Sequence, residues 1–290
     1  NILENSSKQL KEFGTFGYVI PLSYVSTPRM KKIRDVLDEQ LSEQYILSYS
    51  DRPDCLFTSV HQKLNVFFAK KSGKKVCYTG NYQYWYKGER EKLFEDTTAI
   101  RNNFISPNFI PKIGNQEDSA IFRKIYSTEN TITDHYDTNG SSIYLNMRAT
   151  FWIKAFLEEH GSAEYKKLNF DADMRYLMMC IFNSSLFWWF WVCISDCWHI
   201  TNKELNSFRI PINFNRTKVR ELALRMETCL EETKVYVGTK QTEYEYKHKE
   251  CIDIIHEIDD YIAEIYGLTT SENLYIKNFN LRYRLGGGAI

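Results

Sequence analysis

The chain has 290 residues, enough to bury a core, and domain-size statistics favour two or three domains over one. Lys plus Arg and Asp plus Glu each number 37, so the formal net charge is zero and any site for a polyanion must be local. Aromatic residues make up 15% and charged residues 26%, which excludes a disordered chain and favours a globular one.

The seven cysteines are scattered, odd in number and without a Cys-x-x-Cys pair, which predicts a reducing, cytoplasmic compartment. Cys193, Cys197 and His199 form the one close set of zinc-type ligands. A fourth ligand is missing nearby and Cys193 lies in an apolar run, so buried cysteines are favoured over a zinc site. The N-terminus has no signal-peptide pattern, and its start without methionine is compatible with a fragment of a longer protein.

The first 86 residues predict the closing part of an α/β sheet. A helix end at 6–12 is followed by glycines and a short buried strand at 18–22, and residues 28–41 have apolar positions at helical spacing. Strands are then expected at 45–50, 64–71 and 76–86. The order helix, strand, helix, strand, strand indicates the end of an α/β sheet with a hairpin at its edge.

Residues 80–175 have short strand-like pieces separated by Asn, Gly, Pro and Ser, which indicates an irregular α+β module. Residues 172–194 are predicted to form one helix that is apolar almost all round. Polar residues at 183–185 interrupt it and Asp196 ends it, so it is too short to span a membrane and is interpreted as a buried core helix.

The last predicted elements are two helices within residues 217–265, joined near Val237 and Gly238 and packed as an antiparallel hairpin. Their apolar stripe is expected to contain Val219, Leu222, Leu224, Met226, Leu230, Ile252, Ile255, Ile258, Ile262 and Ile265.

Motifs for an internal catalytic centre are missing. The glycines of the first strand precede it and do not lead into a helix, and there is no nucleophile elbow, His-Glu-x-x-His or Walker lysine. Carboxylates cluster at Asp171 and Asp173 and at 257–260, which leaves a metal-dependent nuclease as a hypothesis. Solvated helix faces are the favoured interpretation of the second cluster.

Two segments mix aromatic, basic and amide side chains as nucleic-acid sites do. The segment 78–94 offers Tyr82, Tyr84 and Arg90 for base stacking and phosphate contacts. An edge strand with a solvated face explains it equally well. The second segment offers Asn146, Arg148 and Lys154, and strand alternation would point Asn146 and Arg148 the same way, although an ordinary strand surface has the same pattern.

Three segments together resemble one family, the bacterial adenine-N6 DNA methyltransferases, particularly large restriction-modification polypeptides that fuse methylation with target recognition. They are "FGTFGYVIPLSYVSTPRMKKIRDVL", "FNSSLFWWFWVCISDCWHITNKELNSFRIP" and "EIDDYIAEIYGLTTSENLYI". The family's methyl-donor glycine motif and its Asn/Asp-Pro-Pro-Tyr/Phe tetrapeptide are absent. The resemblance therefore implies no catalytic residue and no cofactor in this chain, with S-adenosylmethionine implied only for a full-length protein.

The resemblance implies an α/β plus α+β fold in three parts. Residues 1–78 would be the last third of a Rossmann-like methyltransferase domain, 79–215 a DNA target-recognition domain, and 216–290 a C-terminal helical region. The expected partner is double-stranded DNA, with no membrane, and the parent polypeptide would be a DNA adenine methyltransferase, with endonuclease activity left open. His199, Asn202 and Lys203, just after the aromatic helix, are then placed to approach DNA. The alternative function is a protein-interaction module that docks through an exposed stripe of the 217–265 hairpin.

Overall fold

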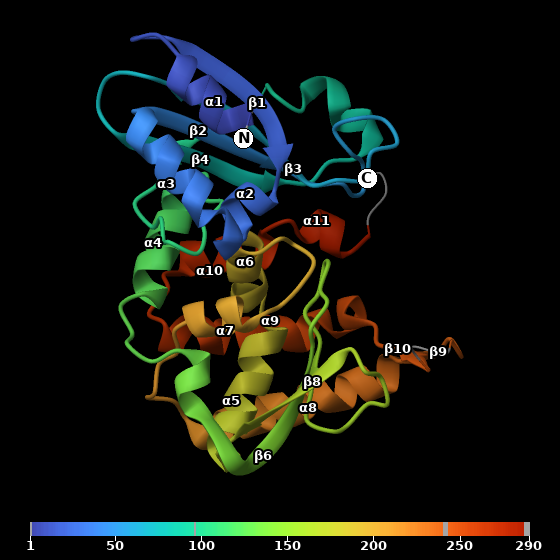
Figure 1. The fold of residues 1–290 in the computed structure, drawn as a ribbon. Coiled ribbons are helices and arrows are strands. Elements are labelled where there is room, and N and C mark those ends of the chain that lie inside the picture. Colours follow the sequence, from blue (N-terminus) through green and yellow to red (C-terminus); the bar gives the residue numbers. More distant parts are fainter. Residues whose placement is uncertain (1, 96, 240–242, 287–290) are drawn as a thin grey trace. The chain divides into compact units, whose positions relative to one another are not determined.

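The computed structural model describes residues 2–95, 97–239 and 243–286. The chain divides into two compact units, which are described separately: unit 1 contains residues 1–120 and 192–196, and unit 2 contains 121–191 and 197–290. Both units contain helices and strands, so the chain is a mixed α/β protein (Figure 1). The three predicted domain limits stay a prediction.

Unit 1 is built on a mixed sheet with the strand order β1-β3-β2-β4-β5. Its strands are β1 (Thr15–Pro21), β2 (Glu43–Tyr49), β3 (Leu64–Lys70), β4 (Val76–Gln83) and β5 (Ile100–Arg101). The strand β3 is antiparallel to β1 and to β2, so β1 and β2 run parallel to each other, and β2 is also parallel to β4. The four strands expected from the sequence are confirmed. The hairpin predicted at the sheet edge is not formed around Gly73, because β3 pairs with β1 and β2 inside the sheet and β4 pairs in parallel with β2.

Helices cover one face of this sheet. They are α1 (Ile2–Gln9), α2 (Ser23–Ser26), the 3-10 turn η1 (Pro28–Met30) and α3 (Lys31–Gln40), with α1 packed on α3 (Figure 1). Tyr18 faces α1, because its hydroxyl lies 2.6 Å from Ser6 Oγ. Side chains alternate along a strand, so the neighbouring Val19 points to the opposite face, where Tyr45 and Phe68 are also exposed. The remaining turn of unit 1 is η2 (Lys87–Lys92), and α4 (Gln116–Ile125) begins in unit 1 and ends in unit 2.

Unit 2 combines a small antiparallel sheet with helices. The sheet order is β7-β6-β8, formed by β6 (Tyr136–Asn146), β7 (Ala155–Phe156) and β8 (Tyr165–Phe170) after the turn η3 (Ile132–His135). The helices are α5 (Ala172–Asn183), α6 (Ser185–Ile194), α7 (Asn202–Ser207), α8 (Arg216–Thr233), α9 (Ile252–Ile265), α10 (Thr270–Asn278) and α11 (Leu281–Arg284). A short antiparallel ribbon, β9 (Val235–Tyr236) with β10 (Tyr244–Glu245), and the turn η4 (His248–Cys251) lie between α8 and α9.

The expectation of one helix over 172–194 was wrong. Two helices, α5 and α6, are bent by 65° at Ser184, whose ψ of 154° leaves the helical region. The Ser184 hydroxyl donates to the Ile181 carbonyl and accepts from the Phe187 N–H, so it replaces backbone bonds that a continuous helix would use. No described helix by itself is long and apolar enough to cross a membrane, and α5 with α6 meet that test only as a bent pair.

The aromatic block of α6 lies in the core. Trp188, Trp189 and Trp191 are each at most 1% exposed, which confirms the prediction of a buried helix. Phe190 packs edge-on against Phe208, which follows α7.

Helices occur where the C-terminal periodicity predicted them, as α8 and α9, and the two helices contact each other. Val219, Leu222, Met226 and Leu230 are fully buried. Leu224 is 46% exposed, so its assignment to the buried stripe was wrong. It lies two residues from both Leu222 and Met226, which places it on the opposite side of a helix with 3.6 residues per turn.

Candidate nucleic-acid interface

A backbone bridge in unit 2 brings two of the predicted contact residues together. Arg148 and His199 are opposite each other in an isolated antiparallel bridge. Hydrogen bonds on both sides hold it, from Ala149 N to Trp198 O at 3.0 Å and from Ile200 N to Met147 O at 2.9 Å. Side chains of directly opposed residues project to the same side, so the Arg148 guanidinium and the His199 imidazole lie on the same side of the bridge.

Two tryptophans of α6 hold the two segments that form this bridge. The Trp188 indole N–H donates to the Thr150 carbonyl at 3.0 Å, and the Trp191 indole N–H donates to the His199 carbonyl at 2.9 Å. Both rings are buried, so each donor finds its partner inside the protein. The apolar helix therefore fixes the backbone on which the exposed polar side chains stand.

Two pairs of exposed polar side chains, Arg148 with His199 and Lys166 with Asn202, make up a group that we call the Arg148 strip. The Arg148 side chain is 60% exposed, and its Nη1 lies 2.8 Å from Glu164 Oε1. Lys166, two residues further along β8, donates from Nζ to Asn202 Oδ1 at 3.1 Å. Lys166 was missed because no strand was predicted at 165–170; within a strand, the pair Lys166–Lys167 places one lysine on each face.

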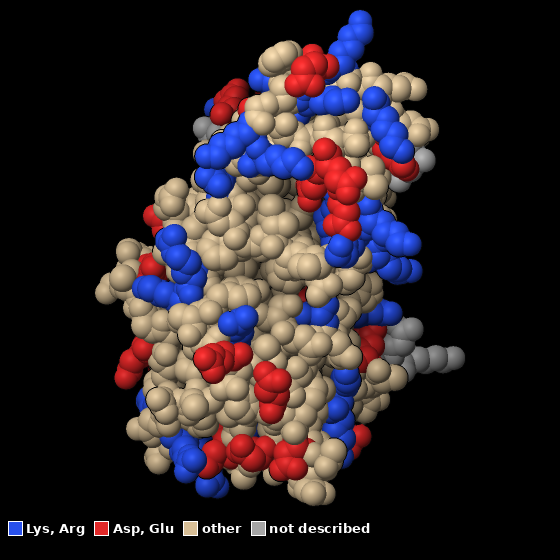
Figure 2. Space-filling view, turned by 60° about the vertical axis from the view of Figure 1, so that its left-hand side comes forward, with Lys and Arg blue, Asp and Glu red and all other residues tan. Residues whose placement is uncertain are grey.

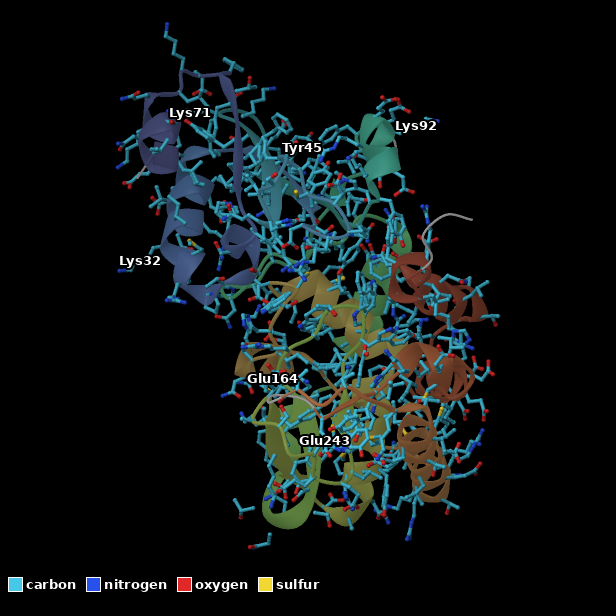
Figure 3. All side chains as sticks on the ribbon, turned by 90° about the vertical axis from the view of Figure 1, so that its right-hand side faces the viewer. Lys32, Tyr45, Lys71, Lys92, Glu164 and Glu243 are labelled. Carbon is cyan, nitrogen blue, oxygen red and sulfur yellow. The ribbon has the colours of Figure 1, made fainter. Side chains whose placement is uncertain are left out.

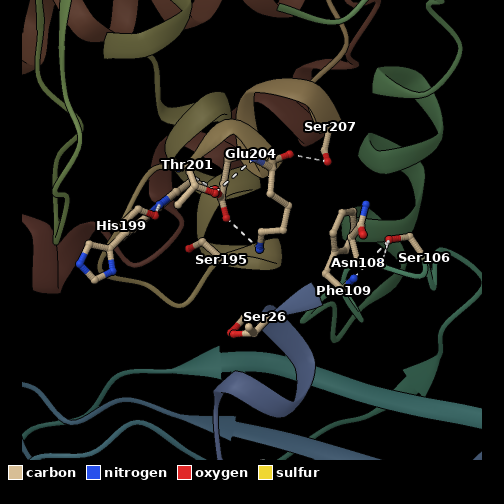
Figure 4. A network of polar contacts seen from close by, with 12 residues as sticks. Ser26, Ser106, Asn108, Phe109, Ser195, His199, Thr201, Glu204 and Ser207 are labelled. Atoms are coloured by element: carbon tan, nitrogen blue, oxygen red, sulfur yellow. Dashed lines mark hydrogen bonds and ion pairs between the residues drawn. The ribbon is translucent and has the colours of Figure 1, made fainter. Parts of the chain in front are cut away.

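The start of α7 sets the position of Asn202. Thr201 is the N-cap, and it forms a capping box with Glu204, whose side chain is buried. Figure 4 shows Thr201 and Glu204 in contact, with the His199 ring directed away from them. The expectation for Lys203 was wrong, because its Nζ lies 2.8 Å from Glu204 Oε1 and its side chain is only 10% exposed. The capping carboxylate holds this ammonium group against the protein.

Asn146 and Lys154 do not belong to the strip. Asn146 is 9% exposed, and its side-chain oxygen accepts the Arg148 N–H at 2.8 Å, so it supports the turn before Arg148. Lys154 lines a cavity of about 970 Å³ with Glu158, Glu164, Glu227, Glu231, Glu243 and Glu245. Glu164 and Glu243 are labelled in Figure 3. Burial lowers the pKa of the Lys154 ammonium, and its acidic surroundings would repel a phosphate.

Among the three predicted contacts of unit 1, burial contradicts the role of Tyr82, whereas Tyr84 and Arg90 stay predictions. Tyr82 is 1% exposed and cannot stack on a base, because β4 turns this residue toward the core. Tyr84 is half-buried, with its ring edge-on to Tyr82 at 5.0 Å. The Arg90 guanidinium binds the Asp54 carboxylate and the carbonyls of Cys55 and Leu56, so it holds a loop of its own unit. Alternation along a strand defines two faces but does not identify the buried one.

The carboxylates and thiols are engaged structurally. Asp171 caps α5, Asp173 pairs with Arg216 and Glu257 pairs with Arg225, whereas Asp259 is buried, contrary to the solvated face predicted for it. Cys193 and Cys197 are buried. Among residues 2–95, 97–239 and 243–286, no group of three or more His, Cys, Asp or Glu could hold a metal ion.

Charge is mixed on the molecular surface. On the face drawn in Figure 2, Lys and Arg side chains alternate with Asp and Glu side chains, and no single sign covers it. This agrees with a net charge of zero and leaves local groups such as the Arg148 strip as the places where a polyanion could bind.

No family model matches the chain, and no curated protein matches it. Two solved structures are similar to it at low identity. One is the type IIL restriction-modification enzyme MmeI in complex with DNA, with 9% identity and a TM-score of 0.48 over 98% of this chain and 51% of that chain. The other is a DrdV–DNA complex determined by cryo-EM, with 15% identity and a TM-score of 0.31 over 49% of this chain and 16% of that chain. This chain thus spans about half the length of MmeI and a smaller share of DrdV.

Proposed function

We propose that this chain recognises a DNA target within an adenine-N6 DNA methyltransferase of a restriction-modification system. The observation that carries the proposal is the Arg148 strip, in which exposed Arg148 and His199 stand on a backbone bridge that two buried indoles hold. An arginine fork matches the O6 and N7 acceptors of guanine in the major groove, and an amide such as that of Asn202 matches adenine. Lys166 supplies a phosphate contact that positions the duplex.

The ion pair between Arg148 and Glu164 suits this role. Surface ion pairs contribute only about 0–1 kcal/mol, so exchanging Glu164 for the acceptor edge of a guanine costs little. Both groups stand on neighbouring backbone segments, which the Met147 N to Glu164 O hydrogen bond of 3.0 Å joins. The strip is therefore preorganised for a charged, planar partner.

The sheet of unit 1 supports the methyltransferase part of the proposal. Two parallel strands, β1 and β2, are joined through α3, which is the β-α-β connection of α/β proteins, and antiparallel β3 lies between them. The described residues do not fit a methyl donor, because β1 leads through Leu22 directly into α2, without a glycine turn at a helix N-terminus. S-adenosylmethionine and the adenine chemistry belong to a longer protein in this proposal, and we derive no methyl-transfer step. The proposal places the protein in the cytoplasm, where its seven cysteines would stay reduced.

The alternative, docking through the 217–265 hairpin, has less support. It needs an exposed apolar stripe, yet the stripe of α8 is buried within unit 2 apart from Leu224.

The test is binding of the chain to a mixed-sequence DNA duplex between about 50 and 200 mM salt. We expect affinity to fall steeply with salt, and Arg148→Ala or Lys166→Ala to weaken binding, with a slope of log K against log salt that is shallower by about 0.9 per lost phosphate contact. The matched control is Arg225→Ala, since Arg225 is also an exposed arginine paired with a glutamate, Glu257 at 2.6 Å. Binding that does not change with salt, or that Arg225→Ala weakens as much as Arg148→Ala, would reject the proposal.

A further inference from the structure

A row of aromatic residues crosses the open face of the sheet in unit 1. In register across the strands lie Gly17 of β1, Phe68 of β3, Tyr45 of β2, Tyr78 of β4 and Arg101 of β5. Phe68 is 50% exposed and Tyr45, labelled in Figure 3, is 37% exposed. Residues in register across a sheet project from the same face, so these side chains form one surface opposite to the face that α1 and α3 cover.

The rings of this row leave a hollow between them. The ring centroids of Tyr45 and Tyr78 lie 4.7 Å apart, which is about the spacing of neighbouring strands. Their ring planes are 10° apart, so the two rings are stacked on each other. The Phe68 ring leans over Gly17 on the other side, where a Cβ on the glycine would lie 2.9 Å from it. Between Tyr45 and Phe68 lies a hollow of about 450 Å³, also lined by Thr15, Gly17, Glu43 and Lys70.

Two cations border the aromatic row. Arg101 follows Tyr78 at one end of the row, and Lys70 lines the hollow. The structure records no ion pair and no side-chain hydrogen bond for either cation with any described residue. Glu43, directly opposite Lys70, is the one carboxylate among the residues that line the hollow. The face thus combines aromatic rings with two cations and a single lining carboxylate, which favours an anionic, aromatic occupant over an apolar protein surface.

We propose that this open sheet face binds a single-stranded stretch of nucleic acid. One unpaired base stacks on Tyr45 within the hollow, while Lys70 and Arg101 contact the phosphates on either side. Aromatic side chains on an open sheet can stack two or three bases of a single strand, and stacking tolerates any base because every base has a π face. The site differs from the Arg148 strip in unit and in ligand, so it does not depend on the proposed duplex recognition.

The experiment measures binding of the 290-residue chain to a fluorescein-labelled, non-self-complementary single-stranded DNA by anisotropy. We expect Tyr45→Ala and Phe68→Ala each to raise the Kd about fivefold to a hundredfold, the range measured for lost base stacking. Tyr45→Phe keeps the ring and should restore most of the affinity. Arg101→Ala should make the salt slope shallower by about 0.7. The positions are exposed, so folding should be preserved, and circular dichroism checks it.

The controls separate this site from general effects. Phe57→Ala removes a ring of similar exposure, 51%, and Lys92→Ala removes an exposed lysine, and neither should change the affinity for the single strand. Arg148→Ala should weaken duplex binding and leave single-strand binding unchanged. Single-strand binding that Arg148→Ala abolishes and Tyr45→Ala leaves intact would overturn the inference. Self-association that Phe68→Ala abolishes, measured by sedimentation, would overturn it as well, because a second copy would then cover this face.

Discussion

Asp259 is a charged group deep inside unit 2, at the point where α5 ends and α6 begins. It is 2% exposed, and its Oδ1 accepts the Ser185 N–H at 2.7 Å. That N–H belongs to the first turn of α6 and has no partner within the helix, so the carboxylate of α9 acts as a cap from a distant part of the chain. Burial raises the pKa of the Asp259 carboxyl to about 6.

This raised pKa predicts how stability changes with pH. The folded state binds the proton of Asp259 more tightly than the unfolded state, whose carboxyl has the ordinary pKa of 3.8. The stabilisation that the protonated Asp259 carboxyl gives the folded state is therefore fully present below about pH 4 and is lost as the pH rises through about 6. The free energy of unfolding falls by at most about 3 kcal/mol over this range. Asp259→Asn keeps the acceptor oxygen and removes the charge.

We expect urea unfolding between about pH 4 and pH 8 to show Asp259→Asn gaining stability relative to the parent chain as the pH rises. Glu264→Gln, an exposed position on the same helix, is the control and should show no such gain. A stability difference between Asp259→Asn and the parent that is constant across this range would contradict the prediction.

At the scale of elements, helix α6 both fills the core and holds the backbone of the bridge, and its aromatic composition predicts only the first of these roles. Its phenylalanines fill the core, whereas two of its tryptophans use their N–H groups to hold Thr150 and His199. The short helix α11 is held in a similar way: the Arg284 guanidinium lies 4.1 Å from the Trp152 ring and 4.5 Å from the Trp188 ring. Trp188 thus connects the bridge of the Arg148 strip with the C-terminal helix.

Trp191→Phe tests the positioning role of α6. The change keeps most of the buried apolar area but leaves the His199 carbonyl without its donor, which should lower the free energy of unfolding by about 1–3 kcal/mol. Because the carbonyl belongs to the bridge, duplex affinity should fall too, measured under conditions where the variant is fully folded. Phe190→Leu is the control: it also perturbs the core of α6 but touches no hydrogen bond of the bridge. Equal losses of affinity in both variants would show that α6 acts only through stability.

For the whole molecule, a net charge of zero means that long-range attraction to DNA is absent and that binding depends on small groups of cations. The carboxylates, by contrast, cap helices, form ion pairs or line a cavity, and no group of them among the described residues is arranged as a metal site. This weakens the hypothesis of a metal-dependent nuclease.

Metal removal provides the matching prediction. We expect EDTA to leave both the melting temperature and the duplex affinity of the chain unchanged, and magnesium or manganese to produce no cleavage of a panel of DNAs. A drop in melting temperature with EDTA would reveal a structural metal, and cleavage that Asp171→Asn abolishes would restore the nuclease hypothesis.

Local patterns in the sequence were sufficient for the order of the elements in the first 86 residues, for α8 and α9, and for the burial of the aromatic block. Strand and helix periodicities depend on residues close in the chain, so β1, β2, β3, α3, α8 and α9 could be predicted from windows of a few residues. The exposure of single side chains could not be predicted in this way. Tyr82 and Lys203 were expected to contact DNA, but Tyr82 is buried in the core and Lys203 forms an ion pair with Glu204. Neither partner can be read from the residue itself.

The sequence by itself determined that this chain is a mixed α/β protein with a buried aromatic helix and dispersed polar clusters, because composition and periodicity express how each segment must bury its apolar face. Only the tertiary structure decided which clusters meet. Arg148 joins His199 through a backbone bridge, Lys166 donates to Asn202, and Asp259 caps α6. Each of these contacts joins segments far apart in the chain, and their pairing depends on how the whole core packs rather than on any local preference.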